Sequence, residues 1–165
     1  MTQKVLVVNS ELCVGCRVCE LACSARHEHS FHPAKSRIHV IRWDGMGVDV
    51  PRVCLQCDKP PCVKVCPVEA FRRDEKTGAV LINYDVCIGC RLCVNECPFG
   101  GISVDQDRGI MIKCDLCGGD PQCVKYCPTK ALQFVKADQV AWLKRRVGAE
   151  KIAKLTKQVV IMEGG

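Results

Sequence analysis

Short apolar runs separated by polar turns cover most of the chain, and only its C-terminal part has the spacing of a helix. The apolar runs have the length and the flanking turns of β-strands. They span Lys4 to Val8, Arg37 to Arg42, Ala79 to Asn83, Gly101 to Val104 and Ala131 to Lys136. From Ala137 to Val159, apolar residues instead recur at roughly helical spacing, while lysines and arginines occupy the other faces. The pattern predicts an α+β fold of short strands followed by an amphipathic, basic helix.

The sixteen cysteines change this picture most, because they fall into four groups of four. The groups are Cys13, Cys16, Cys19, Cys23; Cys54, Cys57, Cys62, Cys66; Cys87, Cys90, Cys93, Cys97; and Cys114, Cys117, Cys123, Cys127. Groups one and three have the spacing C-x2-C-x2-C-x3-C, with which bacterial ferredoxins hold [4Fe-4S] clusters. Groups two and four keep the outer spacings and widen the middle gap. A proline follows the last cysteine of groups two, three and four, whereas Ser24 follows that of group one.

This spacing has a physical reason. Three thiolates at i, i+3 and i+6 of a tight loop can bind three corners of one cubane cluster, whereas the cysteine four residues further on starts a helix that points away and reaches the neighbouring cluster. Groups of this kind therefore work in pairs. The four groups predict four [4Fe-4S] clusters and leave no free thiol.

Two alternatives use the same cysteines differently. Pairs of the form C-x2-C also hold structural zinc, which would make the chain a zinc-binding module or scaffold with four-cysteine sites. Zinc explains neither the third cysteine of each triplet nor the repeated cysteine–proline step. A disulfide framework needs a secretory context, and the first residues have no long apolar stretch, no twin arginine and no small-residue cleavage site. We therefore expect a cytoplasmic protein.

Composition and charge fit a partly inorganic core. Aromatic residues make up only 5% of the 165 residues, so we expect clusters and their thiolates to replace part of the hydrophobic core and the apoprotein to be poorly folded. The formal charge of +6 counts ligating cysteines as neutral. Each [4Fe-4S] site with four thiolates carries roughly −2, which brings the loaded chain to about −2. The excess of lysine and arginine then compensates buried anions, and we expect no nucleic-acid partner.

The segments between the groups indicate how they pair. Between Cys66 and Cys87 the sequence predicts a helical turn, a strand, a turn at Lys76-Thr77-Gly78 and a second strand, which is the hairpin that joins the two motifs of a bacterial ferredoxin. Groups two and three then form an inner unit over 37–104, flanked by the strands Arg37 to Arg42 and Gly101 to Val104. Groups one and four form an outer unit over 1–36 and 105–136, with Lys4 to Val8 and Ala131 to Lys136 as its outer strands. The fold class is thus α+β, with two interlocked ferredoxin-like units, the second inserted in the first, and a C-terminal helix and tail over 137–165.

Crossing the last cysteine within each pair of groups predicts four ligand sets. The first set is Cys13, Cys16, Cys19 and Cys127; the second is Cys114, Cys117, Cys123 and Cys23; the third is Cys54, Cys57, Cys62 and Cys97; the fourth is Cys87, Cys90, Cys93 and Cys66. The competing arrangement pairs group one with two and group three with four. It must accommodate the 30-residue link between Cys23 and Cys54.

Over residues 1 to about 136, the chain resembles the iron–sulfur electron-transfer subunits of the dimethyl-sulfoxide-reductase type. The resemblance rests on four nested motifs, of which the first lacks the proline and the second and fourth are widened. Within that type, Cys19-Glu-Leu-Ala-Cys-Ser and Cys54-Leu-Gln-Cys-Asp-Lys-Pro-Pro-Cys are similar to the small subunits of tungsten aldehyde:ferredoxin oxidoreductases. The ferredoxin-like subunits of hydrogenases and carbon-monoxide dehydrogenases have a close pattern. The fourth motif has only five residues between its second and third cysteines, fewer than in many membrane-associated relatives, which would shorten a partner-contacting loop.

The resemblance implies a non-catalytic subunit whose clusters form a row. It would relay single electrons between a catalytic tungsto- or molybdopterin subunit, for which we favour an aldehyde oxidoreductase, and a flavin subunit, ferredoxin or quinone-linked partner. A hydrogenase, formate dehydrogenase or carbon-monoxide dehydrogenase complex is the alternative. If the two ends of the row were complementary, copies of the chain could also polymerise into a filament.

Other features add little chemistry. The chain has no C-x3-C-x2-C of radical enzymes, no C-x2-C-H of c-type haem, no GxGxxG, no P-loop and no nucleophile elbow, so we expect no catalytic residues. The irregular spacing of the four histidines predicts solvent-exposed or partner-facing side chains; they are His27, His29, His32 and His39. The apolar stripe of the C-terminal helix either covers the chain's own units or docks a partner, and we expect no integral membrane segment.

Overall fold

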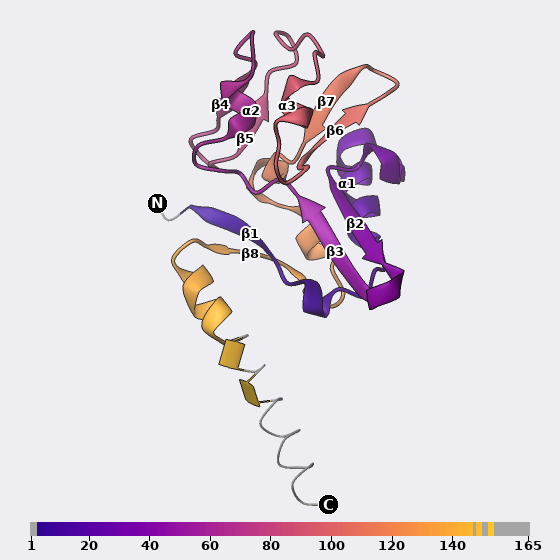
Figure 1. The fold of residues 1–165 in the computed structure, drawn as a ribbon, viewed down its shortest axis with the longest axis vertical. Helices are drawn as coiled ribbons and strands as arrows, with labels where there is room; N and C mark the ends of the chain where they lie inside the picture. Colours follow the sequence, from indigo (N-terminus) through magenta and orange to yellow (C-terminus); the bar gives the residue numbers. More distant parts are fainter. Residues whose placement is uncertain (1–2, 147, 150–151, 154–165) are drawn as a thin grey trace, which may run out of the picture.

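The computed structural model describes residues 3–146, 148–149 and 152–153. Short strands and short helices form the body of the molecule, and the helical segment that follows the last strand extends away from it (Figure 1). The strands are β1 (Lys4–Val8), β2 (Ile38–Trp43), β3 (Val48–Val53), β4 (Phe71–Arg73), β5 (Val80–Ile82), β6 (Ile102–Asp105), β7 (Ile110–Lys113) and β8 (Leu132–Lys136). The α-helices are α1 (Val18–Glu28), α2 (Pro61–Lys64), α3 (Leu92–Asn95) and α4 (Gln122–Lys125). The structure therefore has the predicted mixture of short strands and helices.

The eight strands form four two-stranded antiparallel sheets. The first described strand pairs with the last, from Lys4 opposite Lys136 to Val8 opposite Leu132, which joins the two ends of the predicted outer unit. The strands β4 and β5 form the hairpin expected between groups two and three. In its turn, Thr77 donates from N and Oγ1 to Asp74 Oδ2, and Gly78 has a φ of +71°. The turn predicted at Lys76-Thr77-Gly78 is confirmed.

The expected role of Arg37 to Arg42 and Gly101 to Val104 is only partly right. Both are strands, β2 and β6, but each belongs to a further hairpin, because β2 pairs with β3 and β6 pairs with β7. The sequence analysis missed β3 because Pro51 and two charged residues interrupt its apolar pattern. Pro51 lies opposite Val40, whose N–H points away from β3 and donates to Glu20 Oε1 at 2.6 Å. Proline is tolerated there because the ladder needs no N–H from it.

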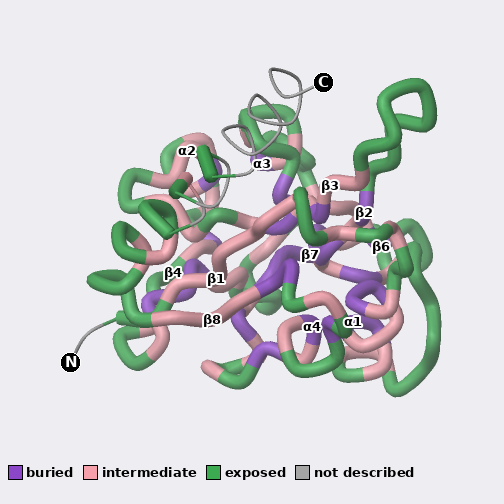
Figure 2. Tube along the Cα trace, turned by 90° about the horizontal axis from the view of Figure 1, so that it is seen from below, coloured by how far each residue is buried: buried purple, intermediate pink, exposed green. Residues whose placement is uncertain are grey.

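Cysteines supply much of the buried interior. Five of the twelve buried residues in the larger core cluster are cysteines, beside aliphatic residues such as Ile38, Leu116 and Leu132. A smaller core cluster combines Cys62 and Cys93 with Ile102 and Met111. Figure 2 shows the buried segments inside the molecule, with β7 among them. The core is therefore built around thiols, as the low aromatic content suggested.

After β8, the described residues 139–146, 148–149 and 152–153 are helical. Leu143 and Gly148 line a cavity with Val7 and Val8 of β1, so the start of the segment packs on the β1–β8 pair. Ile152 is 66% exposed, so the apolar stripe is uncovered there. The remainder of the predicted helix and tail, 154–165, lies outside the described residues. No helix in the described part of the chain is long and apolar enough to cross a membrane.

An ion-pair network ties the β6–β7 turn to α1. The Asp105 side chain is fully buried and accepts from Arg108 Nε at 2.5 Å, while Arg108 Nη2 donates to Glu28 Oε2 at 2.7 Å. Lys35 pairs with Asp107 at 2.7 Å in the same turn. Burial raises the pKa of Asp105, but the hydrogen bonds and charge of Arg108 outweigh it and hold this pKa below its ordinary value.

Replacing Asp105 by Asn should therefore destabilise the folded protein by about 1–3 kcal/mol, because Arg108 and the backbone N–H groups of the turn lose a charged, buried acceptor. For a chain of this size each kcal/mol lowers Tm by roughly 2–4 °C. Because the folded pKa lies below 3.8, the stabilisation is present above that pH and is lost only as the pH falls through the folded value. Thermal denaturation of the iron-loaded protein at pH 7 measures the effect. Glu75→Gln, at an exposed position of the β4–β5 turn, is the control and should leave Tm unchanged.

Candidate iron–sulfur centres

The third cysteine of every group lies in a helix, and in groups two, three and four the fourth lies just beyond the end of that helix. Cys62, Cys93 and Cys123 lie in α2, α3 and α4, each four residues long. The expectation that the fourth cysteine starts the helix is therefore wrong: Cys66, Cys97 and Cys127 follow these helices, and the next residue is proline. Proline restricts the residue before it to extended conformations and stops the helix there. In group one, Ser24 stands in place of proline and α1 continues past it to a total length of 11 residues. Cys19 and Cys23 therefore share one helix.

The loops before these helices contain left-handed residues. In group one these are Gly15 and Arg17, with φ of +64° and +57°; in group three they are Gly89 and Arg91, with φ of +69° and +65°. Left-handed residues that alternate with other residues in a tight turn direct successive backbone N–H groups into a concave anion-binding nest. Gly89 also has no room for a side chain, because a Cβ there would lie 2.8 Å from the Gly109 carbonyl oxygen.

Three of the four predicted ligand sets each surround a cavity. Members of the first set line one cavity, those of the second line another, and those of the third line another. In the fourth set, Cys87 and Cys90 lie close enough to Cys93 for their charges to raise its pKa, and α2, which precedes Cys66, contacts α3. The sets combine cysteines that are up to 114 residues apart, such as Cys13 and Cys127. The structure thus brings together the members of three of the four crossed sets, and the fourth set and the ligation of iron by all four stay predictions.

Burial disfavours the charged form of several of these thiols. Burial raises the pKa of Cys19 and of Cys114 to about 12, and the pKa of Cys93 to about 11. Neighbouring cysteines raise these values further. Cys127 differs: burial raises its pKa, but hydrogen bonds from Leu132 and its neighbours outweigh it, and the pKa is lowered. Thiolates in such places need iron or another bound cation, whose binding would release protons.

Backbone N–H groups point at several sulfur atoms. Cys23 Sγ accepts from Arg37 N at 3.3 Å, Cys66 Sγ from Ala70 N at 3.3 Å, and Cys97 Sγ from Gly101 N at 3.2 Å. A thiolate accepts such bonds far better than a neutral thiol does. All sixteen cysteines are free of disulfide bonds. The donor set therefore fits a thiolate-bound cluster.

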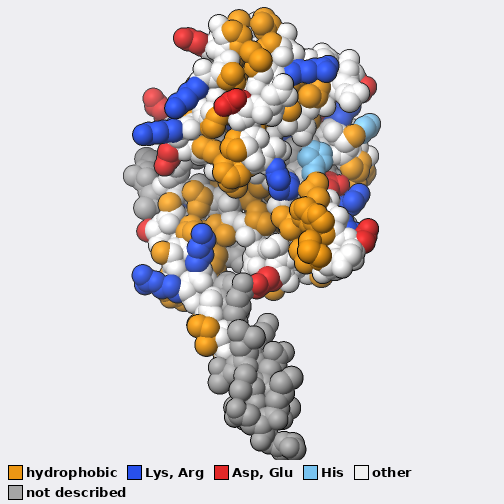
Figure 3. All heavy atoms as spheres, in the orientation of Figure 1, with side chains coloured by type: hydrophobic (Ala, Val, Ile, Leu, Met, Phe, Trp, Pro, Cys, Tyr) orange, Lys and Arg blue, Asp and Glu red, His pale blue; other side chains and the backbone are white. Residues whose placement is uncertain are grey.

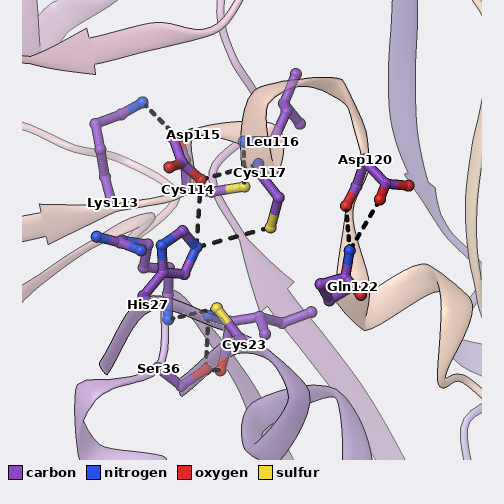
Figure 4. Close-up of polar contacts among 12 residues, drawn as sticks. Cys23, His27, Ser36, Lys113, Cys114, Asp115, Leu116, Cys117, Asp120 and Gln122 are labelled. Carbon is purple, nitrogen blue, oxygen red and sulfur yellow. Dashed lines mark hydrogen bonds and ion pairs between the residues drawn. The ribbon is translucent and has the colours of Figure 1, made fainter. Parts of the chain in front are cut away.

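His27 corrects the expectation for the histidines. It lies on α1 and its side chain is only 11% exposed, with Nε2 3.4 Å from Asp115 Oδ1 and 3.7 Å from Cys117 Sγ (Figure 4). Burial lowers the pKa of His27, and the positive charge of Arg37 lowers it further. His39 is half-buried with Nε2 3.1 Å from Ser103 Oγ, whereas His29 and His32 are exposed as expected. Because Cys117 belongs to the second set, His27 and Asp115 surround a predicted cluster ligand.

Two cations beside the sets, the buried Lys113 and the half-buried Arg37, were not expected from the sequence. Lys113 is 4% exposed and lines the cavity of the third set. Arg37 lines the cavity of the second set. The only available signal was position, since Lys113 directly precedes Cys114 at the end of an apolar run. Helical or strand periodicity alone does not show that such a lysine is buried.

Comparison with known proteins identifies the family. Residues 47–137 match the family model described as a 4Fe-4S dicluster domain, and residues 10–26 match one described as a 4Fe-4S binding domain. The chain belongs to the 4Fe-4S dicluster domain family. It is therefore an iron–sulfur protein with ferredoxin-like domains, and the match favours [4Fe-4S] clusters over structural zinc.

Several curated proteins are similar to this member of the 4Fe-4S dicluster domain family. It is 45% identical over 93 residues to the polyferredoxin-like subunit of the aliphatic sulfonate oxidoreductase of Pyrococcus furiosus, covering 56% of this chain and 53% of that one. It is 38% identical over 106 residues to the electron transport protein HydN of Escherichia coli K12, covering 60% and 58%. It is 42% identical over 103 residues to ArrB, the iron–sulfur subunit of the arsenate respiratory reductase of Shewanella sp. strain ANA-3, covering 59% and 43%. This chain thus spans about half the length of these relatives.

One solved structure matches over nearly the whole length. It is a chain of the active site complex BamBC of benzoyl coenzyme A reductase as isolated, with 26% identity and a TM-score of 0.50. The match covers 95% of this protein and 96% of the matched BamBC chain.

Proposed function

We propose that this protein is the electron-transfer subunit of an oxidoreductase complex and holds four [4Fe-4S] clusters, one in each ligand set. When bound, a [4Fe-4S] cluster takes up and releases one electron at a time. The observation that carries the proposal is that three of the sets surround separate cavities that lie next to one another. Proteins of similar sequence with names such as electron transport protein and polyferredoxin-like subunit support the same role.

Contacts between cysteines of different sets support an arrangement of the sets in a row. Cys19 of the first set and Cys23 of the second lie one turn apart on α1. Cys54 of the third set lies close enough to Cys114 of the second to raise the pKa of that thiol, after the larger effect of burial. Cys62 of the third set shares the smaller core cluster with Cys93 of the fourth. The order is therefore first, second, third, fourth, and electrons would enter at one end and leave at the other.

Both ends of this row reach the surface. Cys16 of the first set and Cys90 of the fourth are the exposed cysteines of the chain. The apolar residues at equivalent positions beside them, Val14 and Ile88, are 60% and 64% exposed. The face drawn in Figure 3 carries separate patches of hydrophobic side chains with lysines and arginines between them. Such patches suit partner subunits that approach the ends of the row.

For the partner at one end we propose a catalytic tungsto- or molybdopterin oxidoreductase, with a tungsten aldehyde oxidoreductase favoured by the motifs. The likeness to a chain of the active site complex of benzoyl coenzyme A reductase supports a catalytic partner. A flavin subunit or a ferredoxin would serve the other end, in the cytoplasm, and copies joined end to end would extend the row into a filament. In this scheme the chain itself has no catalytic residue.

A hydrogenase- or formate-type complex is the second candidate. It is favoured by the similarity to formate hydrogenlyase subunit 2 of Escherichia coli, which is 36% identical over 107 residues. That match covers 65% of this chain and 51% of the relative.

Anaerobic purification of the tagged full chain from its native host tests the role. We expect about sixteen iron atoms and about sixteen acid-labile sulfides per chain, and no stoichiometric zinc. The catalytic subunit should copurify, with tungsten or molybdenum in the complex; nickel would favour the hydrogenase-type candidate. A few zinc ions without sulfide would contradict the electron-transfer role.

A further inference from the structure

The two interior sets of the row each lie against a cationic side chain with buried nitrogen atoms, whereas the cations beside the end sets, Arg17 and Arg91, are exposed. We propose that Lys113 and Arg37 raise the reduction potentials of the third and second sites above those of the end sites, so that the first electrons to enter the protein rest in its interior. This inference rests on the proposed electron-transfer function. It assigns to two residues a role that the cysteine motifs do not contain.

Lys113 is held as a charged ammonium group inside the protein. It is 4% exposed, and Nζ donates to the Val80 carbonyl oxygen, to the Cys114 carbonyl oxygen at 3.2 Å and to Gln56 Oε1 at 3.3 Å. These three oxygen atoms match the three N–H donors of an ammonium group. Among the residues that the structure describes, no carboxylate pairs with Lys113.

A buried charge without a counter-ion is strongly unfavourable. Lys113 lines the cavity formed by the third set, together with Cys54, Cys57, Cys62 and Cys97. Four thiolates around a [4Fe-4S] core carry roughly −2, which is the counter-charge that the lysine lacks. Its positive charge already acts on this set, because it opposes the rise that burial causes in the pKa of Cys62.

Arg37 meets the second set differently. Its backbone N–H donates to Cys23 Sγ at 3.3 Å, and its side chain lines the cavity of Cys23, Cys114, Cys117 and Cys123. The Nε and Nη1 atoms are buried and have no hydrogen-bond partner among the described residues. Leaving buried donors unpaired is costly, so these N–H groups require an acceptor in the cavity. Cluster sulfides and cysteine thiolates are acceptors of the right charge at the right place.

The end sets have no comparable group in the described part of the chain. Arg17 lines the cavity of the first set, and Arg91 stands at the equivalent position beside Cys90 of the fourth; both are exposed. At equal distance, a charge acts about four times more strongly at an effective dielectric constant of 20 than in water at about 80. The buried cations should therefore dominate.

One-electron reduction changes a [4Fe-4S] core from about +2 to about +1, so each site becomes more negative by one charge without making or breaking a bond. A nearby fixed cation stabilises the more negative state and raises the potential. The electron comes from the redox partner at one end of the row. With the higher potentials in the middle, the protein would hold electrons away from the solvent-facing ends until a partner accepts them.

Redox titration of the anaerobically purified full chain, followed by electron paramagnetic resonance, tests this inference. In Lys113→Met, the equilibrium constant for reduction at one of the titration steps should fall at least tenfold. For one electron, this lowers the potential of that step by at least 59 mV. In Arg37→Gln, a different step should move in the same direction. Lys113→Arg, which keeps the charge, and the control Lys76→Gln, at an exposed position of the β4–β5 turn, should leave every step in place.

Iron per chain is measured on each sample, so that the inference and the proposed function fail separately. Variants that keep the iron content of the unmodified chain and show no step lowered by 59 mV overturn the inference while leaving the electron-transfer role intact. An unmodified chain with far fewer than about sixteen iron atoms contradicts the proposed function itself. If Lys113→Met loses its cluster, Arg37→Gln alone decides: a lowered step supports the inference, and an unchanged set of steps refutes it.

Discussion

Removal of iron is expected to abolish the cooperative fold of this protein. The larger core cluster contains five cysteines among its twelve buried residues, and the smaller one contains Cys62 and Cys93. Without iron these positions hold small thiols around cavities, with few large apolar side chains to close them. Structural metal sites contribute apparent binding free energies of about 10–16 kcal/mol in zinc-finger peptides. That contribution is comparable to the whole net stability of an ordinary domain, about 5–15 kcal/mol.

Oxidative removal of iron in the presence of a chelator, under anaerobic conditions, makes the test possible. We expect the far-ultraviolet circular dichroism of the iron-free chain to decrease strongly and its thermal transition to disappear. The control is the same sample after reconstitution with iron and sulfide, which should recover both signals. An iron-free protein that keeps its spectrum and still unfolds in one sharp transition would show that the polypeptide core is sufficient.

Several strands and turns could be predicted from the local sequence alone. The outer strands Lys4 to Val8 and Ala131 to Lys136, and the turn at Lys76-Thr77-Gly78, were predicted because apolar runs and turn residues mark them. Ser24 in place of proline also has a structural result, since it explains why α1 is longer than α2, α3 and α4. These features depend on a few neighbouring residues.

The features that were missed depend on contacts between distant parts of the chain. The strand β3 contains Pro51 at a position where the ladder with β2 needs no N–H, and the opposite N–H, that of Val40, is bound by Glu20 of the distant helix α1. Lys113 and Arg37 are residue types of the surface, yet Lys113 is buried and Arg37 half-buried, and they line the cavities of the third and second sets. His27 was expected to be exposed, but α1 extends far enough to bring it to Cys117 of group four. Periodicity and motif spacing contain no information on such contacts.

Iron content of double cysteine variants should distinguish the crossed pairing from the sequential one. Under crossed pairing, Cys13 and Cys127 bind the same cluster, as their shared cavity suggests. Cys13→Ala and Cys127→Ala should then each reduce the iron from about sixteen to about twelve atoms per chain, and the double variant should still contain about twelve. The second change removes no further cluster because its site is already empty of iron.

The matched control exchanges one partner. Under crossed pairing, Cys13 and Cys66 belong to different sets, so the double variant Cys13→Ala/Cys66→Ala should retain only about eight iron atoms. Sequential pairing of group one with two reverses both results, because Cys66 would then complete the cluster of Cys13, while Cys127 would belong to that of group three. Since each arrangement predicts non-additive loss for one double variant and additive loss for the other, the comparison does not depend on the absolute accuracy of the iron assay. The antiparallel pairing of β1 with β8, which holds Cys13 and Cys127 at adjoining ends of two strands, leads us to expect the non-additive result for Cys13 and Cys127.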